Sequence, residues 1–492
     1  MSKNTPFRYD FVGSFLRPET LKRARRDFEE GKISKEELTK VEDDAILDLV
    51  EKQKKAGYHV ITDGEFRRAT WHLDFMWGFN GVGHEPTKTG LPFHGEAAMI
   101  DDTYLTGKIS VDQHPFVEHF KFVKALEDEN TVAKQTIPAP AQFLEQFIMP
   151  MSLPNTNQYY PDVEELAEDI ANGYKKVIRD LYDAGCRNIQ LDDCSWGMCV
   201  DPHATAIFGT DEAGLQKIME QLLDINNRAI EGAPEGFVIN THVCRGNFHS
   251  TYASSGAYDR VAETLFAREN VSAYYLEFDD ARSGGFEPLK SVSGDKKVVL
   301  GLITTKSPKL EDKEDVIKRI HEAAKYVPLD RLYLSPQCGF ASCEIGNKLT
   351  EEEQWKKLAL VKEIAEEVWG EEKSNRVLKP AIFIAGQDGY AESRNAKKQK
   401  YIINYNQTWT GGLIYFNISD ETVAGHPNRR VLVDFSDRPN ERADGYDQIV
   451  DSGSYLDTDT GDIYFNLRVM DGAYGATGGF GIEVLLSNRA DL

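Results

Sequence analysis

Short apolar runs alternate with amphipathic stretches along most of the chain. Eight runs rich in β-branched, aliphatic and aromatic residues stand out, at 11–15, 59–65, 132–140, 188–193, 237–244, 273–279, 298–304 and 332–338. Segments with helical spacing of apolar residues separate them, most clearly at 35–56, 162–185, 212–231, 311–326 and 351–369. Strands that alternate with helices favour a parallel sheet, and eight such units predict an α/β fold of the (β/α)8 TIM-barrel type.

Two stretches depart from this alternation. Residues 66–131 are rich in glycine and aromatic residues without sustained periodicity, which is typical either of a lid over a catalytic face or of an ordered surface insertion. From residue 375 the chain consists of short strand-like runs separated by Gly, Asp and Asn turns. We therefore predict a TIM-barrel domain over 1–374 and an additional C-terminal all-β domain of unknown role over 375–492.

Composition narrows the class of partner. The 492 residues carry a formal net charge of -23, which argues against nucleic acid or an anionic membrane as the partner. The N-terminus has no secretory-type apolar region, and no run approaches the roughly 18 apolar residues of a membrane span. These features predict a cytoplasmic protein that acts on small molecules. In that reducing compartment, the six cysteines, all between 186 and 343, suggest metal ligands or buried thiols more than disulfides.

The strongest chemical signal lies at the ends of three of the predicted strands. His242 and Cys244 are two residues apart, so both side chains project from one face of a strand. Glu277 and Cys338 end two further runs. The carboxyl ends of parallel strands meet at one edge, so these four side chains are predicted to bind Zn2+ together. The alternative is that the cysteines are small buried core residues.

The charge of this ligand set favours chemistry at sulfur. One histidine, two thiolates and one carboxylate would leave a zinc site with a net charge of about -1. Such a site suits either a structural zinc or a zinc that activates a thiol, with the carboxylate as the ligand that yields its position. A thiol on zinc loses its proton near neutral pH and stays nucleophilic, as alkylation of sulfur requires.

Further polar residues end or follow the other runs. Glu65 and Asp192 would bring two carboxylates to the same edge, where they could bind a substrate ammonium or divide acid and base roles. The alternatives are a salt-bridged turn between Glu65 and the arginines that follow it, and a helix cap at Asp192. Ser14 lies near the end of the first run, and Lys306 follows the seventh.

Several of these segments carry a family resemblance. FVGSF, ITDGEFRR, NIQLDD, THVC, YLEFDDARSG and LSPQCG resemble the catalytic barrel of cobalamin-independent methionine synthases, and more closely its short single-barrel relatives. The likeness covers roughly residues 8–370. It implies a homocysteine S-methyltransferase of the 5-methyltetrahydropteroyltriglutamate-homocysteine class, which forms methionine by methyl transfer to a zinc-bound homocysteine thiolate.

The resemblance also implies roles for individual residues. It assigns the zinc ligands to His242, Cys244, Glu277 and Cys338. It implies further that the amino acid part of homocysteine is bound by three residues, Ser14, Glu65 and Asp192.

The residues expected to act on the methyl donor depart from the family pattern. Lys306, in TTKSP, stands where full-length members have a catalytic histidine, and it could donate a proton or bind an anionic part of the substrate. Together with Asp192 it is a candidate catalytic residue. Met198 replaces a glutamate that the resemblance leads us to expect, and the family's folate-stacking tryptophan has no clear counterpart after IPAPAQFL. The methyl donor, of the 5-methyltetrahydrofolate type or another, therefore stays open.

Two other functions remain as alternatives. An alkyltransferase or lyase similar to epoxyalkane:coenzyme M transferases would act on another thiol, but a sulfonate would prefer cations such as Lys306 or Arg282 to the pair Glu65 and Asp192. A binding or regulatory module would take up zinc without alkylating any thiol.

Overall fold

The computed structural model describes residues 4–370 throughout and, further along, eight short strands between residues 383 and 482. The chain divides into two compact units, Met1–Ser374 and Asn375–Leu492. Each unit is described by itself.

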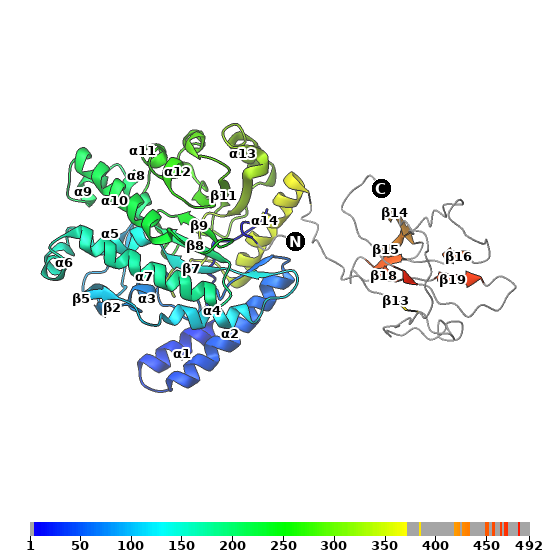
Figure 1. Cartoon of the computed structure of the whole chain (residues 1–492), viewed down its shortest axis with the longest axis horizontal. Helices are drawn as coiled ribbons and strands as arrows, with labels where there is room; N and C mark the ends of the chain where they lie inside the picture. The colour runs from blue at the N-terminus through cyan, green and yellow to red at the C-terminus, as the bar shows by residue number, and fades with distance from the viewer. Residues whose placement is uncertain are drawn as a thin grey trace. The chain divides into compact units, whose positions relative to one another are not determined.

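A six-stranded parallel sheet lies at the centre of the first unit (Figure 1). Its neighbouring strands follow the order of the sequence: β7 (Gln135–Pro138), β8 (Asn188–Asp193), β9 (Val238–Val243), β10 (Ala273–Glu277), β11 (Lys297–Ile303) and β12 (Leu332–Pro336). A shorter parallel pair, β1 (Val60–Ile61) with β6 (Val132–Ala133), precedes β7 and is separated from it by Lys134. At the other edge, Tyr9 forms an isolated parallel bridge with Leu334 of β12. The mixed α/β class predicted from the sequence is confirmed.

Seven of the eight predicted runs contain strands, and the first does not. The prediction of a strand at 11–15 is wrong, because the backbone there makes hydrogen bonds to the loop after β1 and does not pair with a neighbouring strand. Gly13 has a φ of 148°, its carbonyl accepts from the Thr62 hydroxyl at 2.9 Å, and the Phe15 N–H donates to the Gly64 carbonyl at 3.1 Å.

The long helices agree with the amphipathic segments of the sequence: α2 (Lys35–Lys55), α7 (Val163–Asp183), α10 (Glu212–Ile230), α13 (Lys313–Ala323) and α14 (Glu351–Trp369). Capping boxes start two of them, with Ser34 and Glu37 at α2 and Thr350 and Glu353 at α14. The other helices of the described residues are α1 (Glu19–Glu29), α3 (Leu73–Met76), α4 (Pro115–Lys124), α5 (Pro140–Ile148), α6 (Leu153–Tyr159), α8 (Ser195–Val200), α9 (Ala204–Ile207), α11 (Asp259–Ala262) and α12 (Leu265–Arg268), with 3-10 turns η1 (Ala281–Ser283), η2 (Glu287–Ser291) and η3 (Leu329–Arg331).

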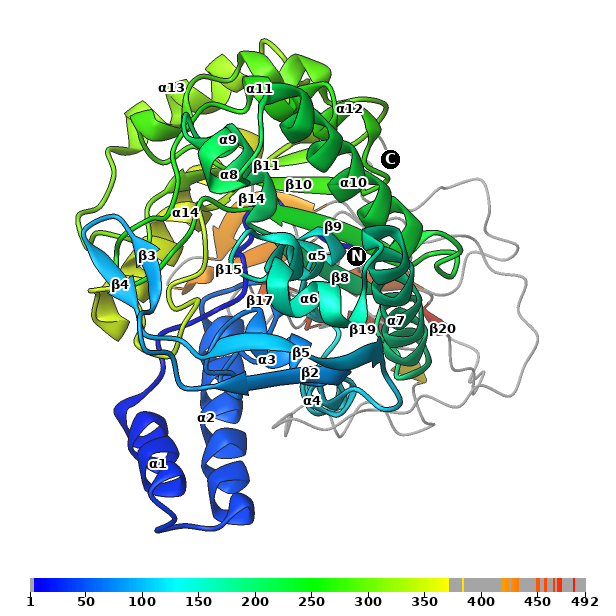
Figure 2. The same cartoon turned by 90° about the vertical axis from the view of Figure 1, so that its left-hand side faces the viewer.

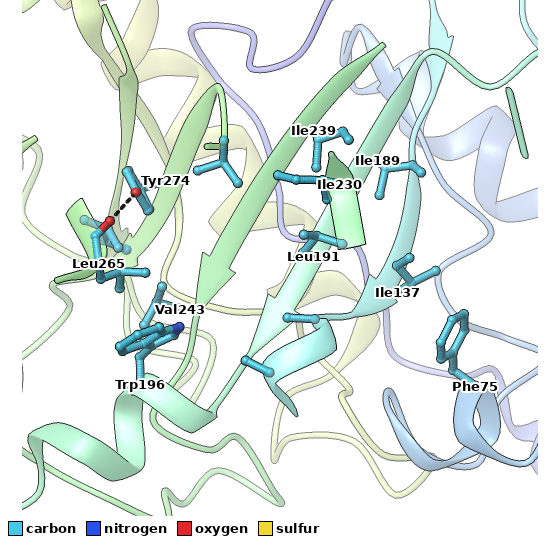
Figure 3. Close-up of a cluster of buried hydrophobic side chains, with 14 of the residues drawn as sticks. Phe75, Ile137, Ile189, Leu191, Trp196, Ile230, Ile239, Val243, Leu265 and Tyr274 are labelled. Carbon is cyan, nitrogen blue, oxygen red and sulfur yellow. Dashed lines mark hydrogen bonds between the residues drawn. The ribbon is translucent and has the colours of Figure 1, made fainter. Parts of the chain in front are cut away.

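Alternation along the strands separates an apolar face from a polar one. Figure 3 shows Ile189 and Leu191 of β8 among the apolar side chains between the sheet and its helices. The residues between and after them, Gln190 and Asp192, are also buried but face the other side of the strand. A strand covered on both faces therefore still presents a row of polar side chains, and this row leads to the candidate site.

Residues 66–131 are an ordered insertion that touches the loops at the carboxyl ends of the strands. Besides α3 and α4 it forms two antiparallel ribbons, β2 (Asn80–Glu85) with β5 (Asp102–Ser110), and β3 (Leu91–Phe93) with β4 (Glu96–Ala98) (Figure 2). The β3–β4 hairpin packs Phe93 on Phe248, with ring centroids 5.3 Å apart. The hairpin thus contacts the loop that follows β9, and a lid role for it stays a prediction.

In the second unit the structure describes antiparallel strands. Four form one sheet in the order β14 (Ile418–Val423), β15 (His426–Leu432), β17 (Tyr455–Asp457) and β18 (Ile463–Tyr464). Two pairs are added by β16 (Gln448–Asp451) with β19 (Leu467–Met470), and β13 (Phe383–Ile384) with β20 (Gly481–Ile482). Most of 375–492 lies outside the described residues, so the all-β domain stays a prediction. None of the helices in the described part of the chain has the length and apolarity needed to cross a bilayer.

Candidate metal centre

Four side chains capable of binding a metal converge at the carboxyl edge of the sheet. His242 lies on β9, Cys244 directly follows that strand, Glu277 ends β10, and Cys338 comes two residues after β12. Their potential ligand atoms all lie within 4.8 Å of one another, and all four residues are buried. The structure therefore brings together the four residues that the sequence nominated from three separate segments.

His242 is held in the form that a metal requires. Its Nδ1 lies 3.1 Å from the carbonyl oxygen of Tyr275, which can only accept, so Nδ1 carries the hydrogen. In the neutral ring the Nε2 atom then keeps its lone pair, and within the described part of the chain this buried atom makes no hydrogen bond. A ring nitrogen left bare opposite a backbone-anchored N–H is the usual arrangement of a metal-binding histidine.

The two sulfur atoms have a spacing that suits one cation. The Sγ atoms of Cys244 and Cys338 lie 3.6 Å apart, close to the separation of about 3.8 Å for two thiolates bound at about 2.3 Å in a tetrahedron.

Hydrogen bonding with the Cys194 thiol, together with burial, raises the pKa of Cys244 well above its usual value. Hydrogen bonding with Cys244, and then burial, does the same for the pKa of Cys338. A bound cation would offset this cost of forming thiolates. Cys194, the third thiol here, was not nominated from the sequence.

Arginines hold the Glu277 carboxylate at the centre. Its Oε1 accepts from the Arg245 backbone N–H at 3.1 Å, and its Oε2 accepts from the Arg282 guanidinium at 2.8 Å. Burial works to raise the pKa of Glu277, but the positive charges of Lys306, Arg282 and Arg245 outweigh it and bring the pKa to about 2. Glu277 is thus ionised. Arg245 was missed in the sequence, although it directly follows the Cys244 motif.

Lys306 contributes the largest of the positive-charge effects that lower the pKa of Glu277. Its Nζ is buried and makes no hydrogen bond with any residue that the structure describes. A cation in this state is available to a group that enters the site from outside.

Glu65 is presented to the site by an uncommon backbone conformation. Its φ is 63°, which non-glycine residues rarely adopt and which is concentrated at functional sites. Oε1 accepts from the Thr136 hydroxyl at 3.0 Å and lies 3.4 Å from the Arg68 guanidinium, whereas the buried Oε2 accepts no hydrogen bond from the described residues. Burial, opposed by Arg68 and reinforced by Asp192, raises the pKa of Glu65. The salt-bridged turn therefore accounts for only one of the two carboxylate oxygens.

Asp192 lies near Glu65 and is oriented by a buried polar chain. The Gln190 amide donates to its Oδ1 at 2.7 Å, and Gln190 in turn accepts from the Lys134 ammonium at 3.0 Å. Lys134 also forms an ion pair with Asp10 at 3.2 Å. Burial raises the pKa of Asp192, and hydrogen bonding to Gln190 opposes it.

The helix-cap interpretation of Asp192 is wrong, because the N-cap of α8 is Cys194, without a side-chain cap hydrogen bond. The neighbouring Asp193 accepts from the backbone N–H and the hydroxyl of Ser195 at the start of α8. Alternation along β8 turns the two aspartates to opposite faces, which leaves Asp192 available to a ligand.

Ser14 joins the site through the loop after Cys338. Its carbonyl accepts from the Phe340 N–H at 3.0 Å, and its hydroxyl accepts from the Ala341 N–H at 3.3 Å. The buried Arg17 clamps the same loops, because its guanidinium donates to the carbonyls of Ala341 and Glu65 at 2.6 and 2.8 Å. Nothing in the sequence pattern singled out Arg17.

A mixed α/β fold with a candidate metal centre that contains two cysteines at its strand ends defines the class of protein. The family described as the catalytic domain of cobalamin-independent synthase matches residues 148–367. The uncharacterized protein YxjG of Bacillus subtilis is 43% identical over 371 residues, which is 75% of this chain and 96% of YxjG. The chain belongs to the cobalamin-independent methionine synthase family.

Two further relatives carry functional names. A crystal structure from Listeria monocytogenes, given as a candidate vitamin-B12 independent methionine synthase, is 40% identical, covers 75% of this chain and 100% of its own, and has a TM-score of 0.60. A methionine synthase of Pyrococcus abyssi is 27% identical over 337 residues, covering 67% of this chain and 84% of that protein.

Proposed function

We propose that this chain catalyses the zinc-dependent transfer of a methyl group to the thiol of homocysteine, which forms methionine. The observation that carries the proposal is the buried cluster of two thiols, one imidazole and one carboxylate within 4.8 Å. Asp192 pairs with His242 of this cluster on the neighbouring strand, and its charge acts on Glu65. The family membership and the methionine synthases among its relatives support it.

The donor set favours zinc among divalent cations. Soft thiolates with one imidazole select Zn2+ over Mg2+ or Ca2+, which prefer oxygen ligands. His242, Cys244, Glu277 and Cys338 would hold the ion. When bound, it would lower the pKa of the substrate thiol so that sulfur reacts as a thiolate near neutral pH.

The residues around the cluster suit an amino acid substrate. The free Oε2 of Glu65 and the carboxylate of Asp192 would accept hydrogen bonds from the substrate ammonium, and Ser14 would line the same end of the site. Burial of both acids strengthens such bonds, because water does not compete for the ammonium there.

Lys306 is the candidate for the proton that methyl transfer requires. As the new carbon–sulfur bond forms, the bond between the methyl group and the donor breaks and leaves an electron pair on the donor. The Lys306 ammonium, to which no described residue hydrogen-bonds, could protonate that atom or bind an anionic part of a substrate. The donor would be of the 5-methyltetrahydrofolate type or another methyl carrier.

A second candidate is alkyl transfer to a different thiol, such as the sulfonate-bearing coenzyme M. The Lys306 ammonium favours it, since a sulfonate needs a cation and the described residues offer this one no hydrogen bond. Mass spectrometry of products separates the two: homocysteine and coenzyme M are each paired with methyltetrahydrofolate and other methyl donors. Methionine supports the first candidate, whereas a methylated coenzyme M alone would replace it with the second. A protein that binds zinc and alkylates neither thiol would be a binding or regulatory module.

The metal ligands can be tested separately from activity. We expect His242→Ala and Cys338→Ser to lose stoichiometric zinc, measured by elemental analysis of the purified chain. Cys186→Ser is the matched control, because Cys186 is a buried thiol that precedes β8 at the opposite end of the strands. Wild-type zinc content in both ligand variants would contradict the assignment.

We also propose that the strands of the first unit close into a (β/α)8 TIM barrel. The support is the sequential parallel order of β7 to β12, the extension by β6 and β1, and the bridge from Tyr9 to β12. The Phe15 to Gly64 hydrogen bond links the Tyr9 segment to the loop after β1. The units 1–374 and 375–492 would then be a catalytic barrel and an all-β domain.

A further inference from the structure

A chain of three buried polar side chains leads to the sulfur of Cys338. Asn347 donates to the Oδ1 of Asn247 at 2.9 Å, and Asn247 donates to the Oγ of Ser342 at 3.0 Å. The Oγ of Ser342 lies 3.8 Å from the Sγ of Cys338, within reach of a hydrogen bond to sulfur. The three polar residues come from two different loops, so the tertiary fold assembles the chain.

Backbone groups fix the direction of the first link. The Asn347 Oδ1 accepts from the Ser250 N–H at 2.8 Å, and its Nδ2 donates to the Thr305 carbonyl at 2.9 Å. A backbone N–H only donates and a carbonyl only accepts, so the amide cannot be flipped.

The direction of the next two links follows. Asn247 must turn its Oδ1 toward Asn347, and its Nδ2 also donates to the Gly339 carbonyl at 2.8 Å. The Ser342 oxygen therefore accepts from Asn247, which leaves its hydroxyl hydrogen free to point at Cys338. The chain thus delivers a hydrogen-bond donor to one particular sulfur atom.

We propose that Ser342, oriented by Asn247 and Asn347, is a positioning residue that donates a hydrogen bond to the Cys338 thiolate and keeps that sulfur a ligand instead of a methyl acceptor. This inference rests on the proposed zinc-dependent methyl transfer. A hydrogen bond to a thiolate withdraws charge from sulfur and lowers its basicity and nucleophilicity. Methyl transfer then favours the substrate sulfur, which does not receive this bond.

The other candidate thiolate has a comparable donor from the backbone. The Gly246 N–H lies 3.3 Å from the Sγ of Cys244. Besides the contacts that thiols make with one another, Cys244 thus has a backbone donor and Cys338 has the Ser342 hydroxyl, which can be exchanged without moving the backbone.

The test uses the full chain loaded with Co2+ in place of zinc, because thiolate ligands give cobalt a near-ultraviolet charge-transfer band. We expect Ser342→Ala to shift this band to longer wavelength. We also expect methyl iodide to methylate Cys338 about tenfold faster in this variant. This rate ratio corresponds to the free energy of about one hydrogen bond. In that step the sulfur–carbon bond forms as iodide leaves with the electron pair of its bond to carbon, and peptide mass spectrometry measures the rate.

Two further variants test the direction of the chain. Asn247→Asp places an acceptor where Nδ2 stood, so the Ser342 hydroxyl should turn toward it, and the band and the methylation rate should change as in Ser342→Ala. Ser342→Thr keeps the hydroxyl and should restore both. Ser335→Ala is the matched control, because the Ser335 hydroxyl is buried and bonds to the Pro336 carbonyl at 2.8 Å.

The outcomes separate this inference from the function on which it rests. A wild-type thiolate band that Ser342→Ala leaves unchanged, with an unchanged Cys338 methylation rate, would overturn the role of Ser342 and leave the metal centre intact. A wild-type chain without a thiolate-to-cobalt band would overturn both proposals.

Discussion

Glu65→Gln isolates the contribution of one carboxylate oxygen to substrate binding. Because the Thr136 hydroxyl and Arg68 already engage Oε1, only Oε2 is free for a substrate ammonium. Glutamine keeps the size and one carbonyl oxygen, but it removes the charge. The loss is then one charge-assisted hydrogen bond, worth about 1.5–3 kcal/mol, which weakens homocysteine binding by about 10- to 150-fold.

Calorimetric titration of the zinc-loaded chain with homocysteine measures this change. Glu269→Gln is the matched control, because Glu269 is a fully buried acid that precedes β10, at the opposite end of that strand from Glu277. We expect the control to bind homocysteine as the wild type does. An unchanged dissociation constant for Glu65→Gln would refute the assignment of Oε2 to the ammonium.

The pH dependence of the same titration gives a second readout. Glu65 must be ionised to pair with an ammonium, and burial raises its pKa in the folded chain, so wild-type affinity should increase as pH rises through that pKa. Glu65→Gln removes the carboxyl group that would have to lose a proton when homocysteine binds. The affinity of this variant should therefore depend less on pH. The stability of the free protein should depend on pH in the opposite direction to the affinity. The contribution of Glu65 to stability is present below the pKa of Glu65 in the unfolded chain, and it is lost as pH rises through the raised pKa in the folded chain.

Two other predictions concern the lysines around the site. Lys134→Met should lower the free energy of unfolding by about 3–5 kcal/mol, because it leaves the fully buried Asp10 without its ion-pair partner. Urea denaturation measures this loss. Lys40→Met is the control, because its partner Asp44 is exposed, and an equally small loss in both variants would contradict the prediction. Lys306→Met should keep stoichiometric zinc and lower the rate of methyl transfer by about 10²- to 10⁴-fold, the usual contribution of a general acid; turnover at the wild-type rate would exclude Lys306 as the proton donor.

Much of the fold could be predicted from local pattern. The long helices begin and end within a few residues of the amphipathic segments, because apolar spacing and capping residues are local properties. The predicted strand at 11–15 failed, because the conformation of Gly13 and the hydrogen bonds to the loop at Gly64 depend on distant neighbours. A run of apolar residues signals burial, but it does not tell whether the backbone pairs with a strand.

The candidate site, like the fold, could be predicted from the sequence only in part. The sequence by itself determined which residues could take part, because ligand type, alternation and position after a strand are all written along the chain. His242, Cys244, Glu277 and Cys338 were identified in this way.

Only the tertiary structure decided what surrounds these residues. The bare Nε2 of His242, the arginines on Glu277 and the donor chain from Asn347 through Asn247 to Ser342 all depend on atoms that are far apart in sequence. Hydrogen bonds have a direction and a reach of a few ångströms, and only the packing of separate loops sets which groups meet at that distance.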